Sequence, residues 1–207
     1  MKIFYAFVLL TFLGLVILGC SESTDQLVAP VEKANTVSLE KGIIHSVTGS
    51  AHWRSVPVTG ETNVRFSFNA IMHNDGTVTG NLMTRDKGPM MYGKARVYDL
   101  KVSENIAKLS FQFEKGNLGQ FYGVDITSIY GWLVAIDNGE GVNGSEDFCS
   151  MILFTDGSDI SPQTIESLDA MSPEEYLQIM QTYFLPMWGI PYEDFLSPID
   201  NGSIQVR

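Results

Sequence analysis

Cysteine and basic residues are scarce in this 207-residue chain. It contains two cysteines, Cys20 and Cys149, and 13 Lys and Arg stand against 24 Asp and Glu. The acidic balance argues against nucleic acid as a partner, because phosphates require Lys and Arg. It argues equally against electrostatic docking on anionic lipid. An acidic protein instead favours cations in any cleft.

Recognisable catalytic motifs are also absent from the sequence. No H-E-x-x-H, C-x-x-C or G-x-S-x-G occurs, and there is no phosphate-binding loop. Carboxylates such as Glu61, Glu114 and Asp125 could act as acid and base, but any acidic chain contains such residues. We therefore expect a protein without catalysis, and a hydrolase-type enzyme with an unrecognised site remains an alternative.

Long apolar runs are missing too, except at the N-terminus. Lys2 is followed by 16 residues without a charge, Ile3 to Leu18, and the run ends in Ile17-Leu18-Gly19-Cys20 before a polar stretch. A positive start, an apolar middle and small residues at a cut site are typical of a secretory signal. The Cys after Gly19 resembles a bacterial lipobox, and this resemblance implies that Cys20 is acylated. An uncut membrane anchor is the alternative, but the run is shorter than the ~20 residues of a spanning helix.

These features predict three parts: a lipoprotein signal peptide at 1–20, a flexible tether at 21–41 and one domain at 42–207. We expect a lipoprotein of the bacterial cell envelope, held at the outer membrane by acyl chains such as palmitate on Cys20. Its partner is then the lipid bilayer, with an envelope protein or a small ligand still to be identified. Removal of residues 1–20 takes one Lys away and leaves a net charge of −12. Because Cys20 is assigned to lipid, no intramolecular disulfide is expected, and Cys149, which lies in the apolar run Phe148 to Phe154, is expected to be a buried core residue.

The domain carries the pattern of an antiparallel β protein. Val64 to Met72 alternates apolar and polar residues, which predicts a half-buried strand, and Asp75-Gly76 then predicts a tight hairpin. A change of parity at Tyr98-Asp99 suggests a bulge in a longer strand. Including these, strands are expected at about 43–54, 64–72, 77–84, 91–102, 107–114, 121–136 (one or two strands), 148–154 and 203–206. The fold class is therefore mainly β, a single barrel or sandwich of about seven or eight antiparallel strands.

A helical insertion is expected before the last strand, at about 159–199. Ser161-Pro162 can start one helix, and Ser172-Pro173-Glu174-Glu175 has the pattern of a capping box. Tyr176, Leu177, Met180, Tyr183 and Phe184 form an apolar stripe, which Pro186 is expected to end. The insertion either packs this stripe on the sheet as a lid or binds a partner, and an apolar loop at Trp188 and Tyr192 would matter in both cases.

Three motifs in order resemble a family of uncharacterised secreted bacterial proteins. They are Arg65-Phe66-Ser67-Phe68-Asn69-Ala70, Asp137-Asn138-Gly139-Glu140-Gly141 followed by Asp147, and Gly202-Ser203-Ile204-Gln205-Val206. In that family they form an R-x-F-S-F-x-A strand, a D-N-G-E-G hairpin and a terminal G-x-I-Q-V strand. The resemblance implies a compact all-β domain and supplies no established activity. The helical insertion departs from the family pattern.

The second motif is also a candidate metal site. Asp137, Asn138, Glu140 and Asp147 offer oxygen ligands of the kind that calcium prefers, although their spacing is not that of an EF-hand. The same residue types also suit a hairpin loop, in which Gly and Asn provide positive φ. We favour the turn, and calcium is the one cofactor that remains a candidate.

The aromatic residues of the strands raise a further alternative. A closed barrel of about eight strands can hold one small ligand, as lipocalins do. Such a cavity would be lined by Phe66, Phe68, Phe111, Phe113, Tyr122 and Trp132. These side chains can equally fill a solid core. Our sequence-based hypothesis is a lipid-anchored binding or structural module, with a lipocalin-like carrier of an apolar ligand as the alternative.

Overall fold

A computed structural model describes residues 42–56, 60–86, 90–139, 146–150, 153–156, 161–199 and 203–207. These residues belong to one compact unit, which spans 39–207. The predicted signal peptide, Cys20 and the predicted tether at 21–41 lie outside the described residues. Within the described part of the chain, no helix is both long enough and apolar enough to cross a membrane.

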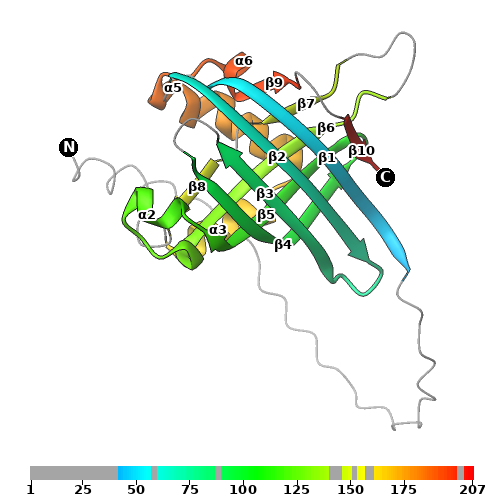
Figure 1. The fold of residues 1–207 in the computed structure, drawn as a ribbon. Coiled ribbons are helices and arrows are strands. Elements are labelled where there is room, and N and C mark those ends of the chain that lie inside the picture. The colour runs from blue at the N-terminus through cyan, green and yellow to red at the C-terminus, as the bar shows by residue number, and fades with distance from the viewer. Residues whose placement is uncertain are drawn as a thin grey trace, which may run out of the picture. The chain divides into compact units, whose positions relative to one another are not determined.

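One antiparallel sheet dominates this unit and curls into a half-barrel (Figure 1). The strands are β1 (Ile43–Val56), β2 (Gly60–His73), β3 (Val78–Asp86), β4 (Tyr92–Ser103), β5 (Ile106–Gly116), β6 (Ile129–Ile136), β7 (Phe148–Ser150), β8 (Leu153–Asp156), β9 (Leu196–Pro198) and β10 (Ser203–Val206). Their order is β10-β1-β2-β3-β4-β5-β6-β7-β9. Because β7 and β8 pair with successive parts of β6 and β9 has three residues, the sheet contains eight principal strands. The predicted fold class is confirmed.

Local sequence signals explain the hairpins and bends of the sheet. At the tip between β2 and β3, the backbone N and the hydroxyl of Thr77 both donate to Asp75 Oδ1, and Gly76 has a φ of 78°. Such a turn needs a glycine, because other residues rarely adopt positive φ. The expected bulge also occurs, since the pairing of β4 with β5 shifts register between Val97 and Asp99.

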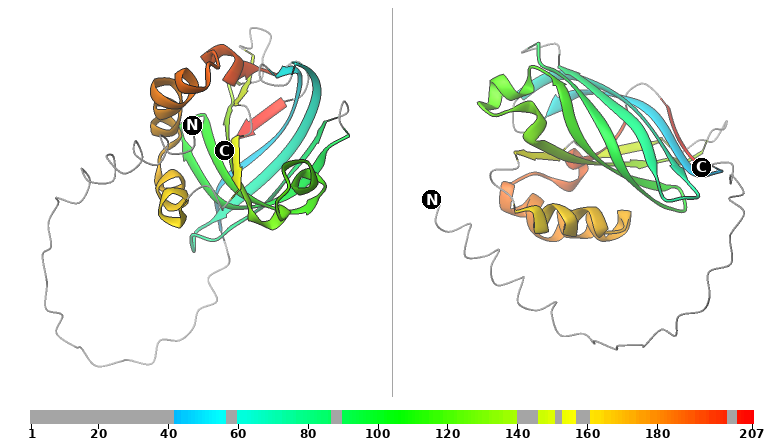
Figure 2. Two further views of the ribbon diagram at one scale, coloured as in Figure 1. Left: turned by 90° about the vertical axis from the view of Figure 1, so that its left-hand side faces the viewer. Right: turned by 90° about the horizontal axis from the view of Figure 1, so that it is seen from below.

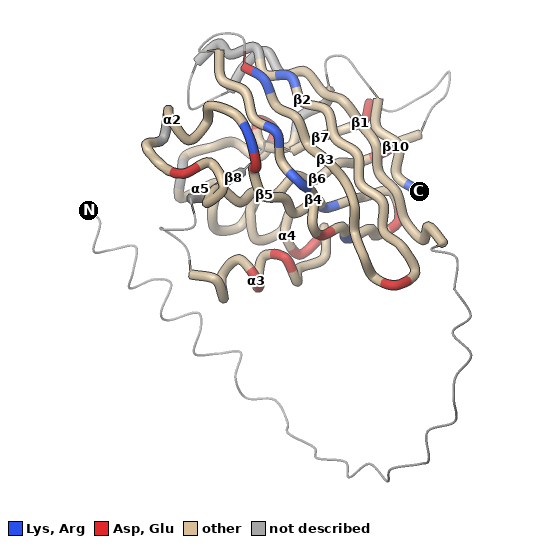
Figure 3. Tube along the Cα trace, turned by 60° about the horizontal axis from the view of Figure 1, so that its bottom comes forward, with Lys and Arg blue, Asp and Glu red and all other residues tan. Residues whose placement is uncertain are grey.

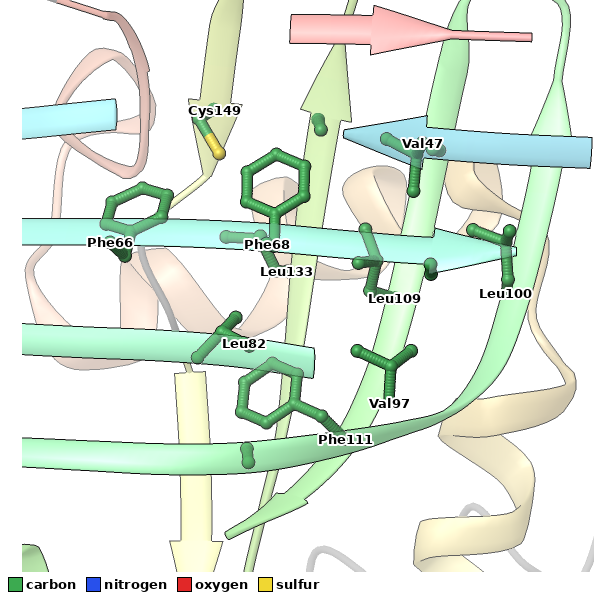
Figure 4. Close-up of a cluster of buried hydrophobic side chains, with 14 of the residues drawn as sticks. Val47, Phe66, Phe68, Leu82, Val97, Leu100, Leu109, Phe111, Leu133 and Cys149 are labelled. Atoms are coloured by element: carbon green, nitrogen blue, oxygen red, sulfur yellow. The ribbon is translucent and has the colours of Figure 1, made fainter. Parts of the chain in front are cut away.

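The main core lies on the concave face of the sheet (Figure 4). Phe66, Phe68, Leu82 and Phe111 point into it, together with Cys149. Burial raises the pKa of the Cys149 thiol, so the thiolate that a nucleophile needs is disfavoured. The prediction of Cys149 as a core residue is confirmed.

A helical layer covers the opposite face of the sheet over β6 and its neighbours (Figure 2). It consists of α3 (Pro162–Ala170), α4 (Pro173–Ile179), a π-helical turn (Met180–Phe184), α5 (Leu185–Trp188) and α6 (Tyr192–Phe195). Ser172 and Glu175 form the predicted capping box. Tyr176 and Met180 are buried against Trp132 and Val134 of β6, which confirms that the insertion packs on the sheet.

Two local predictions were wrong. A strand was expected from Phe121, but the chain forms α2 (Leu118–Tyr122) and a 3-10 turn (Ile126–Ser128) before β6 begins. Asp125 caps the 3-10 turn and Gly123 ends α2 in the left-handed conformation, so local hydrogen bonds compete successfully with strand pairing there.

Pro186 does not end its helix, which continues to Trp188 and is capped by Gly189 in the left-handed conformation. The amide of Leu185 donates to Met180 O, a wider π-type bond that changes the register just before Pro186. Pro186 thus lies in the first turn of α5, where its missing N–H is tolerated.

Candidate functional site

A basic hollow lies on the outer face of the sheet, on the part that the helical layer leaves uncovered. Its volume is about 1160 Å³, and its lining comes from β1, β2, β3, β4 and the end of β5. The outward-facing residues form two rows across the strands, His52-Arg65-Arg85-Tyr92 and Ser50-Ser67-Met83-Lys94-Lys115, each member directly opposite the next. Inward-facing Ala51, Phe66 and Asp86 are buried beneath them.

Two pairs of like charges face each other in these rows. Arg65 lies opposite Arg85, and Lys94 lies opposite Lys115. Like charges directly opposite one another destabilise a sheet. Within the described part of the chain none of the four residues has an ion-pair partner, whereas Arg96 pairs with Glu114 at 3.8 Å in the next row. The four cations therefore outnumber the carboxylates among the described residues that line the hollow, where Asp86 is the one acidic side chain.

The basic residues of the domain are clustered, although the protein as a whole is acidic. Lys and Arg positions gather on β2, β3 and β4, while Asp and Glu lie mainly on α3, α4 and the loops (Figure 3). The expectation that an acidic chain favours cations in any cleft is wrong for this hollow. Net charge is a sum over the whole protein. The register of neighbouring strands can still bring the few basic residues together on one face of the sheet.

Cations and apolar groups alternate at the centre of the hollow. Arg85 lies opposite Tyr92, and Met83 lies opposite Lys94 on the same two strands. The four residues thus form a square with the cations on one diagonal and the apolar groups on the other. Tyr92 is 54% exposed and Met83 is 57% exposed. This surface can bind an anionic group and an apolar ring side by side.

Backbone contacts hold the β4 end of the hollow in place. The Asn117 side chain accepts a hydrogen bond from Tyr92 N at 2.8 Å and donates one to Met90 O at 3.2 Å. Gly116 has a φ of 138°, and a Cβ there would lie 2.3 Å from Tyr92 O. Glycine at this position therefore permits the close approach of β4 and β5 that brings Lys115 beside Lys94.

The candidate calcium residues come together at a different place, where the two ends of the sheet meet. Asp137 Oδ2 accepts a hydrogen bond from Val206 N, and Asp147 Oδ2 accepts one from Ile204 N, both at 2.9 Å. These amides lie on the edge of β10 that faces away from β1. The two carboxylates thus satisfy an open strand edge and join β10 to the β6–β7 connection. We call this arrangement the carboxylate clasp.

The remaining oxygens of the clasp also accept hydrogen bonds. Asp137 Oδ1 bonds to Gly139 N, Asp147 Oδ1 to Asn138 N, and Asn138 Oδ1 to the side chain of Asn105. Glu140 lies outside the described residues. Among the residues that the structure describes, no group of three or more His, Cys, Asp and Glu is placed to hold a metal. Calcium stays a prediction, and the hydrogen bonds give these residues a structural role that does not need it.

The candidate ligand-lining aromatics divide between the two faces of the sheet. Phe66, Phe68, Phe111 and Phe113 are buried in the main core, and the rings of Phe111 and Phe113 meet edge to face at 5.6 Å. Trp132 lies on the other face under the helical layer, and the side chain of Tyr122 is outside the described part. A Cβ on Gly49 would lie 2.5 Å from the ring of Phe68. This tight contact favours a filled core around these rings over a ligand cavity.

A second polar cluster, centred on Lys108, was not anticipated from the sequence. Lys108 has no exposed surface, and its Nζ donates to the carbonyls of Leu168 and Asp169 at the end of α3. Burial lowers the pKa of Lys108 to about 8. The Asp169 carboxylate accepts hydrogen bonds from Tyr98 and Trp132. A cation at the carbonyl end of a helix is favourable, so this cluster fastens the helical layer to the sheet.

Comparison with protein-family models, curated proteins and solved structures found no match. The resemblance to an uncharacterised secreted family therefore remains a prediction from its three motifs. The structure gives these motifs a common location. β2, which carries the first, pairs with β1; β1 pairs with β10, which carries the third; and β10 is bound by carboxylates of the second. The second and third motifs are thus joined directly, and the first lies two strands away from the third.

Sequence reasoning missed the basic hollow, although a signal for it was present. Arg65 and Arg85 occupy outward positions of two strands joined by the Asp75-Gly76 hairpin. Once that turn is assigned, the register of the hairpin follows, and the two arginines must face each other. Of the two residues of the expected apolar loop, the side chain of Trp188 lies outside the described part of the structure, and Tyr192 is half-buried.

Proposed function

We propose that this chain is a lipid-anchored protein of the bacterial cell envelope, and that its β domain is a binding module which acts through the basic hollow. The anchor rests on the lipobox-like sequence at Ile17 to Cys20. The binding role rests on one observation. Two like-charged pairs, Arg65 with Arg85 and Lys94 with Lys115, line an open hollow without ion-pair partners in the described chain.

Facing pairs of like charge destabilise the sheet, so their presence in the hollow favours a role in binding over a role in folding. A sheet that only had to fold would place opposite charges or neutral groups across from one another. The hollow is also open to solvent, whereas Lys108 is fully buried under the helical layer. A ligand can reach the four cations of the hollow without any movement of the helical layer.

The anchor is tested by fractionation of cells that express the full-length chain. Cys20→Ala should move the protein from the membrane to the soluble fraction, because the acyl acceptor is lost. Cys149→Ala is the matched control, since it removes the buried cysteine and keeps Cys20. Unchanged partitioning of the Cys20 variant would contradict the anchor.

The binding role is tested by native mass spectrometry of full-length protein purified from membranes in detergent. We expect a bound small molecule that is lost when Arg65 and Arg85 are both replaced by Gln. Arg96→Gln is the control, because Arg96 lies on the same outward face outside the hollow and pairs with Glu114. Absence of any bound molecule would contradict the proposal. So would its retention in the double variant, or an equal loss in the control.

A further inference from the structure

We propose that the basic hollow binds a sugar ligand that carries phosphate or carboxylate groups. This inference rests on the proposed function, since it names the ligand class of the same hollow. It follows from three features of the lining: paired cations, an apolar platform between them, and a row of hydroxyl groups beside them.

The paired cations set the charge of the ligand. Facing residues on neighbouring strands lie about 5 Å apart, so Arg65 and Arg85 can bind one anionic group together. Lys94 and Lys115 form a second such pair on the adjacent row, about 7 Å further along the strands and two strands, or about 10 Å, across the sheet. Arginine suits the planar, bidentate recognition of carboxylate and phosphate. The hollow thus provides two anion sites at a fixed separation.

The apolar platform indicates that the ligand is more than a free anion. Tyr92 and Met83 lie between the cation pairs and are more than half exposed. An aromatic face exposed beside cations can stack on the C–H face of a sugar ring. Ser50 and Ser67 lie opposite each other in the row that contains Met83 and Lys94, and their hydroxyls can bond to ring hydroxyls.

A long polyanion or a membrane surface fits less well. The chain has a net charge of −11, which repels any extended anionic partner outside the hollow. Charges are screened beyond about 8 Å at physiological salt, so a ligand seated inside the hollow experiences mainly its four cations. A flat bilayer cannot fill a hollow of about 1160 Å³, whereas a short oligosaccharide can.

The test is isothermal titration of the full-length protein in detergent. Trigalacturonate, a trisaccharide with one carboxylate on each ring, is the probe, and neutral maltotriose is its matched control. We expect trigalacturonate to bind and maltotriose to give no heat. Arg65→Gln combined with Arg85→Gln should weaken trigalacturonate at least tenfold, Tyr92→Ala should also weaken it, and Arg96→Gln should leave it unchanged. Added salt should weaken it as well, since the contacts are electrostatic.

Folding and binding can be separated in these variants. The double arginine variant should melt at the same temperature as the wild type or higher, because it removes a facing like-charge pair. Lost affinity in a folded or stabilised protein therefore reports the site itself.

Other ligands give other results. Equal affinity for maltotriose, or for inorganic phosphate alone, would overturn the anionic-sugar assignment. Binding only to vesicles that contain phosphatidylglycerol would overturn it in favour of a membrane surface. Glucose 6-phosphate, a sugar that carries one phosphate, is titrated in the same way. If the native molecule is lost in the double variant but neither trigalacturonate nor glucose 6-phosphate binds, the proposed function stands and this inference fails.

Discussion

The carboxylate clasp makes a sharp prediction for Asp147→Asn. Asp147 accepts Ile204 N at 2.9 Å and Asn138 N at 3.0 Å, one on each carboxylate oxygen. Asparagine has the same shape, but it retains one acceptor and turns an NH₂ group toward the other amide. The variant therefore loses one charge-assisted hydrogen bond, weakens the other and leaves a partly buried amide unpaired. A hydrogen bond to a charged group contributes about 1.5–3 kcal/mol, so we expect a loss of about 2–3 kcal/mol.

A loss of this size is easily measured by thermal unfolding. For a domain of this length it corresponds to a decrease in Tm of roughly 4–12 °C. Asp125→Asn is the matched control, because Asp125 also accepts two hydrogen bonds, but both come from Thr127 and the residue is exposed. We expect little change in the control.

The clasp also predicts where the structure loosens. The amides of Ile204 and Val206 should exchange with solvent faster in Asp147→Asn, because β10 loses its second edge contact. When Asp137→Asn is combined with Asp147→Asn, the further decrease in Tm should be smaller than the decrease caused by Asp137→Asn alone, since both residues hold the same strand. A Tm shift no larger than that of Asp125→Asn, with unchanged exchange at β10, would refute the clasp.

Two further predictions concern Lys108 and Gly80. Lys108 has a pKa of about 8 in the folded chain and about 10.5 in the unfolded chain, so the unfolded chain binds more protons between these values. The free energy of unfolding should therefore rise with pH in this range, by on the order of 2 kcal/mol between pH 8 and pH 10. Urea unfolding at several pH values should show this rise in the wild type but not in Lys108→Met. An equal dependence of the free energy of unfolding on pH in the two proteins would contradict the lowered pKa of Lys108. Gly80→Ala should cost about 1–3 kcal/mol, because its Cβ would lie 2.3 Å from Asn69 O. Gly42→Ala is the control, since a Cβ there would make only an ordinary contact, 3.6 Å from Asn74 Nδ2, and an equal loss of stability in both variants would contradict the packing at Gly80.

Much of the fold could be predicted from local sequence signals. Alternation identified β2, Asp75-Gly76 identified its hairpin, and the Ser172 capping box identified the start of α4. Each signal depends on a few neighbouring residues and on bonds within one element. The errors at 121–129 and at Pro186 arose where an unusual local bond, the Asp125 cap or the π-type turn, replaced the expected pattern.

The sites could be predicted less well, for a different physical reason. Period-two alternation shows which residues share a face but not what covers that face. Lys108 and Ser110 alternate with apolar residues as if exposed, yet the helical layer buries both. The hollow was missed because net charge ignores register, which places Arg65 against Arg85. Asp137 and Asp147 were recognised as important residues, but their strand partner β10 lies 57 or more residues away in the sequence.

The proposed binding site for an anionic ligand lies on the outer face of β2, β3 and β4. NMR of the full-length protein in micelles, titrated with trigalacturonate, locates binding directly through changes in amide chemical shifts. We predict that the largest changes fall on Arg65, Arg85, Tyr92 and Lys94, and that they disappear when both arginines are replaced by Gln. Changes confined to the carboxylate clasp or to the helical layer, or no changes at all, would show that the hollow does not bind such a ligand.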